Sequence, residues 1–545
     1  MRTDYVRIYK SVHTWTGIVS GMALFIAFYA GALTVFKEPL TRWATPPAAA
    51  DVAPLETAHD LIVKTLAIAP EAAKGFAIHL QDEEHVLARM AWDVRAPDAD
   101  DHDDSGTRHF GAALDATGAP RVREIEPSPL AGFIDVLHRV VGLPADSDPN
   151  RWLMGVIAAL YTVALVSGVV VLLPSLVKDF FALRIGKNLK RMWLDAHNVV
   201  GIVSLPFHIV MALTAVVFAY HDQIYAIQDK LVHQGKWSQA FQRQPAGASD
   251  APRRDPAAML TPAQLLQAAH AVAPDLEPTM LQYQGVTGPR AVVRVWGKDT
   301  AAVSPRAMGG FAAFDPYSGK LLNTDYLPGR QNTPNLFISS FFALHMASFG
   351  GVEVAWLYFL LGMAGAWLFY SGNLLWIESR RRRAARNQVE APAQRLDTRL
   401  MAAATVGVCL GSVCGISLTI AAGKWLYGSV QDLAFWHQLI YYAIFFGCVA
   451  WAFGRGAAAA SVHLLWLACA LTLCIPLTTL LGWWMPGAGP WTDTSTAALG
   501  VDATALAGAL CFAWMARIAQ RRIERAPGDT VWSLHPRAAG GQRRP

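Results

Sequence analysis

The sequence predicts a mainly α-helical polytopic membrane protein, in which an eight-helix transmembrane bundle carries two periplasmic α+β domains. Two observations predict this fold class. Of the 545 residues, 53% are hydrophobic and only 16% are charged, which is too apolar a composition for an ordinary soluble protein of this size. Eight apolar runs are also long enough to cross about 30 Å of hydrocarbon. They lie at residues 14–36, 152–173, 194–219, 353–376, 401–422, 434–453, 462–484 and 497–517.

The basic residues between these runs predict the orientation of the protein. They precede the first span (Arg2, Arg7, Lys10), separate the second from the third (Lys178, Arg184, Lys187, Lys190, Arg191), and follow the fourth (Arg380 to Arg383, Arg386) and the eighth (Arg517, Arg521, Arg522, Arg525). Cytoplasmic segments are enriched in lysine and arginine, so both termini are predicted to be cytoplasmic. The net charge of +5 reflects this bias, and no basic patch in a soluble domain indicates nucleic-acid binding.

Two long segments, 38–150 and 221–350, interrupt the spans on the outer side. Each begins with a helical pattern, ETAHDLIVKTLA or TPAQLLQAAHAV, and continues with short alternating strands such as AVVRVWG. The chain therefore contains a duplicated unit of span, outer domain, histidine-bearing helix and span. The predicted parts are a first span (1–37), the outer segments (38–150 and 221–350), spans two and three (151–220), a fourth span (351–380), a basic linker (381–400), a four-helix extension (401–520) and a tail (521–545).

Histidines recur at matching places in the two units. His13 in HTWTG and His197 in HNVVG begin spans that run outward, and His138 in VLHRVVG and His345 in ALHMASFGG follow the outer segments. The third span also carries His208, eleven residues after His197. On a straight helix these two would share a face about 16 Å apart. Pro206 lacks an N–H group for the Ile202 carbonyl and is expected to distort the helix near His208.

Two neutral imidazoles at one depth on different helices are what a six-coordinate haem iron requires. The two layers of histidines predict two b-type haems, and the absence of CxxCH excludes covalent c-type attachment. The alternative is that single histidines cap helices or pack in the core. A zinc site is disfavoured because two histidines supply too few ligands.

The elements HTWTG, VLHRVVG, HNVVG and ALHMASFGG resemble the PepSY-associated transmembrane family over about residues 1–380, and the outer segments resemble PepSY domains. The four C-terminal spans resemble an extension of some larger members. The resemblance implies a dihaem cytochrome b of the bacterial inner membrane, related to reductases of iron-loaded siderophores. It implies that electrons enter near a His13–His197 haem, pass to an outer haem and reduce a ferric chelate. His208 lies outside the general family pattern, so the partner of His345 at the outer haem is left open between His138 and His208.

The electron donor is predicted to be membrane quinol or a separate soluble reductase. The chain has no GxGxxG after a strand, no GxxxxGK[ST], and no cytoplasmic segment large enough for a flavin or nicotinamide domain. Two alternatives remain. One is a quinol-linked cytochrome b with another acceptor, such as copper or superoxide. The other is a haem-free permease or sensor whose PepSY domains bind a ligand.

Overall fold

The computed structural model describes residues 3–47, 54–80, 88–95, 107–115, 117–177, 189–231, 234, 253–299, 301–302, 304, 306, 309–382, 392–487, 489–526 and 528–533. The chain divides into two compact units. The first, here called the membrane unit, comprises residues 1–47, 128–219 and 358–545. The second, called the sheet unit, comprises residues 48–127 and 220–357.

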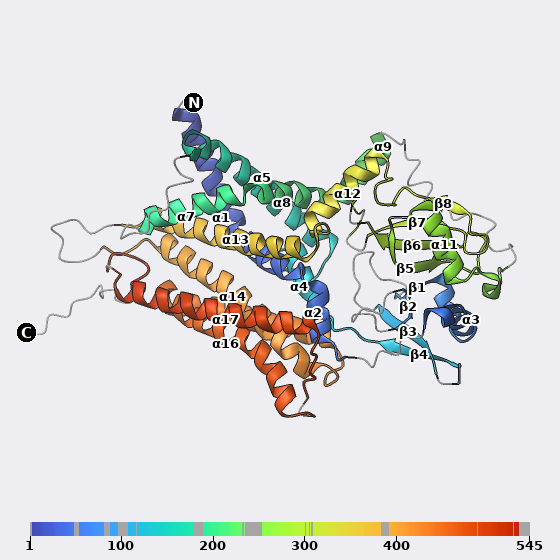
Figure 1. Ribbon diagram of the computed structural model, residues 1–545. Coiled ribbons are helices and arrows are strands. Elements are labelled where there is room, and N and C mark those ends of the chain that lie inside the picture. The colour runs from blue at the N-terminus through green and yellow to red at the C-terminus, as the bar shows by residue number, and fades with distance from the viewer. Residues whose placement is uncertain are drawn as a thin grey trace, which may run out of the picture. The chain divides into compact units, whose positions relative to one another are not determined.

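The membrane unit is built from helices (Figure 1). They are α1 (Thr3–Thr34), α2 (Lys37–Ala44), α4 (Leu130–Arg139), α5 (Asp148–Leu172), α7 (Leu189–Val203), α8 (Leu205–Ala219), α13 (Gly351–Ser379, from Tyr358 onward), α14 (Leu396–Leu426), α15 (Leu433–Arg455), α16 (Ala457–Trp484) and α17 (Thr496–Glu524). Within the described residues, seven helices are long and apolar enough to cross a membrane, and the bent pair α7–α8 makes an eighth. The structure therefore has seven candidate spans, or the predicted eight when the bent pair is taken as one span, and the chain is a membrane protein.

The third span differs from the straight helix that the sequence suggested. It breaks at Ser204 into α7 and α8, whose axes differ by 71°. Pro206 stands in the first turn of α8. A missing N–H group is tolerated there, because the N–H groups of a first turn have no carbonyl acceptor within the helix. The expected distortion is confirmed. The prediction that His197 and His208 share one straight face about 16 Å apart is wrong, because the bend reorients everything after residue 204.

Helix α14 is the central helix of the C-terminal extension, with 83% of its most apolar stretch buried. Its glycines face α15 closely. A Cβ on Gly407 would lie 2.9 Å from the Cα of Val449, and a Cβ on Gly415 would lie 2.8 Å from the ring of Tyr441. Small residues at four-residue spacing let membrane helices approach closely where lipid gives little hydrophobic driving force. This spacing therefore holds α14 and α15 together.

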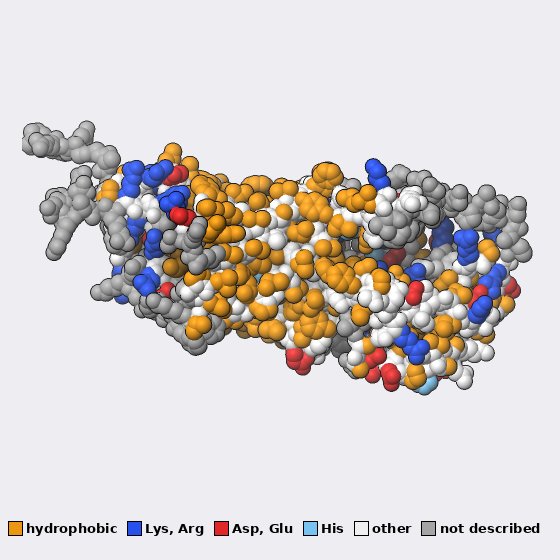
Figure 2. Space-filling view, turned by 90° about the horizontal axis from the view of Figure 1, so that it is seen from above, with side chains coloured by type: hydrophobic (Ala, Val, Ile, Leu, Met, Phe, Trp, Pro, Cys, Tyr) orange, Lys and Arg blue, Asp and Glu red, His pale blue; other side chains and the backbone are white. Residues whose placement is uncertain are grey.

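Basic side chains from separate segments gather at one end of these helices. Arg380 lies over the ring of Trp15 at 5.9 Å, which brings the end of α13 to the start of α1. Arg381 pairs with Asp529, and Arg522 reaches the sulfur of Met192. Figure 2 shows lysine and arginine at this end beside a broad hydrophobic surface. The predicted clustering of basic segments is confirmed for the described ones, while Arg2, Lys178, Arg184, Lys187, Arg383 and Arg386 lie outside the described residues.

The sheet unit contains one antiparallel sheet in the order β4-β3-β2-β1-β5-β6-β7-β8. The strands are β1 (Gly75–His79), β2 (Met90–Val94), β3 (Arg108–Leu114), β4 (Pro120–Ile125), β5 (Glu277–Gln284), β6 (Val292–Lys298), β7 (Gly310–Phe314) and β8 (Leu321–Asn323). Its helices are α3 (Ala58–Ile68), α9 (His221–Leu231), α11 (Pro262–Val272) and α12 (Thr333–Met346). The two predicted α+β segments therefore join edge to edge, through β1 and β5 with Ala77 opposite Gln282.

One continuous core underlies both halves of the sheet. Alternate residues of the central strands, such as Ile78 and Leu281, pack with Leu61 of α3 and Leu265 of α11. In Figure 1 these two helices lie beside the same face of the sheet. Each segment contributes four short strands and one covering helix to this shared core.

Helix α4 belongs to the membrane unit, although the sequence placed it in the first outer segment. Its apolar side chains Leu130, Ile134 and Leu137 pack with Trp43 of α2 and Ile420 of α14. The amphipathic pattern of α4 is thus explained by membrane helices. As a result, His138 is fixed against α1.

Candidate functional site

His13 and His197 face each other inside the membrane unit. Their ring centroids lie 6.4 Å apart with an interplanar angle of 69°. The Nδ1 atom of His13 lies 2.8 Å from the carbonyl oxygen of Ala164 on α5. A carbonyl can only accept, so Nδ1 carries the hydrogen and Nε2 carries the lone pair. This neutral tautomer is the form that binds a metal.

Ser371 orients the ring of His197 in the same way. The Nδ1 of His197 lies 3.0 Å from the hydroxyl oxygen of Ser371. Ser371 donates its own hydrogen to the carbonyl of Leu368 at 2.9 Å, so its oxygen accepts from His197. The lone pair of His197 is therefore also on Nε2. Outer hydrogen bonds of this kind hold ligand histidines in one tautomer and orientation.

His138 on α4 repeats the arrangement of His13. Its Nδ1 lies 2.8 Å from the carbonyl oxygen of Ala27 on α1. A Cβ on Gly31, one turn after Ala27, would lie 2.6 Å from that nitrogen. For His13 the matching residues are Ala164 and Gly168, where a Cβ would lie 2.9 Å from the ring. In both places glycine gives the imidazole access to the carbonyl one turn earlier.

The segments that receive these histidines, here called glycine seats, share a short sequence pattern. The seats read AFYAG (27–31), ALVSG (164–168) and LFYSG (368–372), and each ends in the glycine beside a histidine of another helix. Gly372 is the looser seat, since a Cβ there would lie 3.5 Å from Cε1 of His197. Neither length nor periodicity distinguishes these segments from ordinary packing sequence, which is why only the contacts revealed them.

His208 is the most deeply buried of the predicted site histidines, with 1% of its surface exposed. Its Nδ1 lies 2.6 Å from the hydroxyl of Tyr161, which donates to the carbonyl of His208 at 3.1 Å. The hydroxyl has one hydrogen, so Nδ1–H donates to Tyr161 and Nε2 carries the lone pair. Among the described residues, that Nε2 has no hydrogen-bond partner. The rings of Phe28 and Phe207 lie 5.5 and 5.6 Å away and exclude water.

His345 lies in the last turn of α12, in the sheet unit, whereas the other four predicted histidines lie in the membrane unit. The pairing of His345 with His138 or His208 therefore stays a prediction. The helix ends immediately afterwards, because Ala347 takes the left-handed conformation (φ 53°) as its C-cap. The structure brings together His13 with His197, and it places His138 and His208 separately against α1.

The sequence did not single out His437 on α15. Its side chain is fully buried, and neither ring nitrogen has a hydrogen-bond partner within the part of the chain that the structure describes. Its Nε2 would lie 3.4 Å from a Cβ on Gly423, and its ring lies 6.5 Å from that of Phe133. A lone histidine in an apolar run gives no signal that separates this situation from ordinary packing.

The extension also holds a buried charge pair that the sequence did not reveal. Lys424 is 1% exposed, and its Nζ lies 4.0 Å from the ring centre of Trp43 and 3.3 Å from the hydroxyl of Thr479. Thr479 donates to Asp502 at 3.2 Å, and the Trp43 indole donates to the same carboxylate at 2.9 Å. The hydroxyl thus links cation to anion. This network ties α2 to α14, α16 and α17, because an unpaired buried charge is costly.

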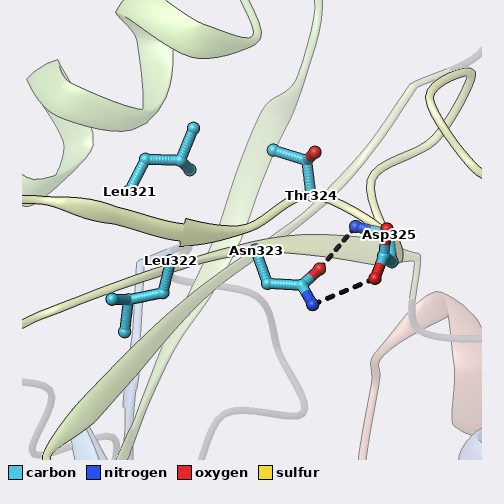
Figure 3. A pocket seen from close by; sticks show the side chains of 5 residues that line it. All are labelled: Leu321, Leu322, Asn323, Thr324 and Asp325. Carbon is cyan, nitrogen blue, oxygen red and sulfur yellow. Dashed lines mark hydrogen bonds between the residues drawn. The ribbon is translucent and has the colours of Figure 1, made fainter.

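A surface hollow of about 280 Å³ lies at β8 in the sheet unit, lined by residues 321–325 (Figure 3). The amide of Asn323 donates to the carboxylate of Asp325 at 3.1 Å, and its oxygen accepts from the backbone N–H of Asp325. The polar groups of the hollow are therefore bonded to one another and leave no obvious chemistry for a ligand. Among the described residues, no three side chains of His, Cys, Asp or Glu form a metal site.

Comparison with known proteins agrees with the histidine elements described above. The model of the PepSY-associated TM region matches residues 10–379. This match includes all five predicted histidines, and the four-helix extension lies beyond it. No curated protein sequence matches the chain. The chain is a membrane protein of the PepSY-associated transmembrane family.

Proposed function

We propose that this protein is a dihaem b-type oxidoreductase that takes electrons from membrane quinol and reduces a ferric chelate, such as a ferric siderophore, outside the cytoplasmic membrane. The single observation that carries the proposal is the facing pair His13 and His197, each with Nδ1–H engaged and its lone pair on Nε2. The clustered basic segments support a cytoplasmic placement of that end and of both termini. The sheet unit would then be periplasmic.

The residues fit the group that the proposal requires. Two metal–nitrogen bonds of about 2 Å, with each nitrogen about 1 Å from its ring centre, need imidazole centroids about 6 Å apart. His13 and His197 have a separation of 6.4 Å. His138, His208 and His345 are the candidates for the second haem. The buried, unpartnered Nε2 of His208 favours His208 among them, because such an atom is costly without a ligand.

When bound, the two haems would carry single electrons across the membrane. The chain's own contribution is orientation and exclusion of water. Ala164, Ala27 and Ser371 hold the imidazole Nδ1–H groups, and the rings around His208 keep its site dry. Apolar helices around such a site tune the redox potential.

The overall reaction balances. One quinol is oxidised to quinone and releases two protons and two electrons, and two ferric chelates each accept one electron to become ferrous. Hard oxygen donors hold ferric iron better than ferrous iron, so reduction releases the metal from the chelate. Because quinol supplies both electrons, the reduction of an iron complex on the outer side requires no nucleotide-binding domain.

An absorption spectrum of the purified full-length protein tests the proposal. The reduced-minus-oxidised spectrum should show the α-band of b-type haem with two haems per chain. Quinol should reduce the protein, and a ferric chelate should reoxidise it in an acceptor screen that includes copper and superoxide. A colourless protein from haem-replete cells would favour a haem-free PepSY permease or sensor. Reoxidation by copper alone would favour another acceptor.

A further inference from the structure

The two faces of the sheet have different chemistry. One face packs on α3 and α11 through alternate residues such as Val293 and Val295 of β6. The other face carries the intervening residues, because successive side chains of a strand point to opposite sides. On β5, β6 and β7 it presents Gln282, Arg294, Trp296 and Phe311, and it is here called the arginine face.

An aromatic platform forms the base of the arginine face. The rings of Trp296 and Phe311 lie 4.6 Å apart, and Phe311 stacks on Tyr326 at 5.1 Å with an angle of 14°. The backbone N–H of Phe311 donates to the carbonyl of Tyr326 at 2.9 Å, which fixes the stack. The indole of Trp296 donates to Gln282 at 3.0 Å. These contacts make the platform rigid before any ligand arrives.

Two arginines stand over aromatic rings at this face. The guanidinium of Arg294 lies 5.0 Å from the ring centre of Phe311, and that of Arg306 lies 5.8 Å from Phe342 on α12. Burial and then the positive charge of Arg306 lower the pKa of Arg294. Both arginines belong to the β6–β7 region, because the backbone of Arg306 pairs with Gly309, immediately before β7. Arg294 bonds to the neutral amide of Gln282 at 3.4 Å, and within the described residues neither arginine pairs with a carboxylate.

Two other arginines of the sheet unit contact both an aromatic ring and a carboxylate. Arg108 lies 4.9 Å from the ring centre of Phe110 and forms two hydrogen bonds with Glu124. Arg254 lies over Tyr317 and pairs with Asp315 at 3.0 Å. Both combine an aromatic ring with a carboxylate. Among the described residues, Arg294 and Arg306 have the ring without a carboxylate, which leaves their charge available to an anionic ligand.

We propose that Arg294 and Arg306, over Phe311 and Phe342, bind an anionic aromatic chelate of ferric iron, of the tris-catecholate class. The inference rests on the proposed function, whose acceptor it names more narrowly. Guanidinium groups recognise oxyanions by paired hydrogen bonds and stack on flat rings, and aryl groups of such a chelate would pack on Tyr326, the exposed member of the platform. A cationic hydroxamate chelate would meet two like charges.

The position of Phe342 connects this site to the redox chain. Phe342 and His345 lie three residues apart on α12, so they share one side of the helix about 4.5 Å apart along its axis. A chelate held by Arg306 would thus lie near the helix that carries a predicted haem ligand. Binding and electron delivery would then meet on α12.

The test measures binding without electron transfer. Gallium(III) forms complexes of the same shape that one-electron donors do not reduce, so the probes are the tris-catecholate complex of gallium and a cationic tris-hydroxamate complex of gallium. Equilibrium dialysis against purified full-length protein should show tighter binding of the catecholate, weakened by added salt. Arg294→Gln and Arg306→Gln should each weaken it about tenfold. Arg108→Gln is the matched control and should bind as the wild type does.

Equal binding of both complexes, or unchanged binding by both glutamine variants, would overturn the inference. Arg294→Lys guards against misfolding, since it should retain most of the attraction while losing paired hydrogen bonds. The haem spectrum is measured on every variant. Gallium binding without any haem would leave the anion site standing and sink the proposed function. Haem reduction and ferric reductase activity without preference for the catecholate would do the reverse.

Discussion

The two halves of the duplication treat their outward-running helix differently. In the first half α1 continues unbroken from Thr3 to Thr34, whereas the second half bends by 71° between α7 and α8. Nine residues after His13 the chain has Met22, and nine after His197 it has Pro206. The bend thus coincides with a proline, which lies two residues after the break and cannot donate a hydrogen bond to the preceding turn.

The same comparison marks His208 as an addition. Eleven residues after His13 stands Leu24, which is 1% exposed. Eleven residues after His197 stands His208, equally buried, with an unpartnered Nε2. The first half shows that an apolar residue packs well at the matching sequence position of the repeat. The repeat itself therefore does not require a histidine at this sequence position, and the variants below test whether His208 binds a ligand.

Substitution of His13 or His197 is expected to have the largest effect and tests the comparison of the two repeated halves. His13→Ala and His197→Ala should each remove one of two haems per chain and leave the other spectrally intact, because one iron cannot stay six-coordinate without both imidazoles. Haem content by pyridine haemochrome and the low-spin spectrum measure this. His463→Ala is the matched control, since His463 accepts from the Trp451 indole at 3.2 Å. Two haems retained in both site variants would refute the pairing.

His208→Leu makes the second half resemble the first at this position. We expect loss of the outer haem or of its low-spin spectrum, because the Nε2 of His208 has no other partner. Tyr161→Phe keeps the ring and removes the acceptor of Nδ1–H, so it should shift the midpoint potential while haem content stays at two. If His208→Leu keeps both haems and stabilises the protein by about 1–3 kcal/mol, the orphan nitrogen was merely tolerated. His138 and His345 would then be the outer pair.

The glycine seats differ in how closely the histidine ring approaches the glycine. Gly168→Ala places a Cβ 2.9 Å from the His13 ring, so the imidazole must shift. We expect a changed low-spin spectrum and weaker retention of the inner haem. Gly372→Ala places its Cβ 3.5 Å from His197, an ordinary contact, and should behave as the wild type. Equal behaviour of the two variants would show that the seats do not position the rings.

The smallest expected effect compares two turns of the sheet unit. Burial raises the pKa of Asp315, but hydrogen bonds from Arg254 and from the backbone N–H groups of Ser318 and Tyr317 outweigh it and lower the pKa to about 2. Hydrogen bonds from Thr117 and Ala119 likewise lower the pKa of Asp115 to about 2. A carboxylate with a lowered folded pKa stabilises the fold above its unfolded pKa, and that stability is lost as pH falls towards 2.

Asp315→Asn should therefore lower the free energy of unfolding of the sheet unit by about 1–2 kcal/mol at neutral pH. The loss should shrink as pH falls through 4 to 2. Asp115→Asn should cost less, because its turn is more exposed and lacks a stacked arginine such as Arg254. Thermal unfolding of the full chain at several pH values checks both variants. A pH-independent loss at Asp315 would mean that the turn geometry, rather than the charge, stabilises this region.

The sequence by itself determined the class of protein, the apolar segments long enough to cross a membrane, the clustering of the basic segments and the repeated histidines. These properties follow from composition and local spacing, which act without knowledge of distant contacts. The family followed from the same elements, and its model matches residues 10–379. Pro206 also predicted a distortion of the third span, since the missing N–H group is a property of that single residue.

Only the tertiary structure decided which surfaces meet. The joining of β1 to β5 merges two predicted domains into one sheet, because each half has an unpaired strand edge that the other satisfies. The seats of His13 and His138 at Ala164 and Ala27 depend on helices more than a hundred residues away. The placement of Arg294 and Arg306 over aromatic rings likewise becomes visible only once their neighbours are known. Long-range packing sets these contacts, and local patterns carry no information about their partners.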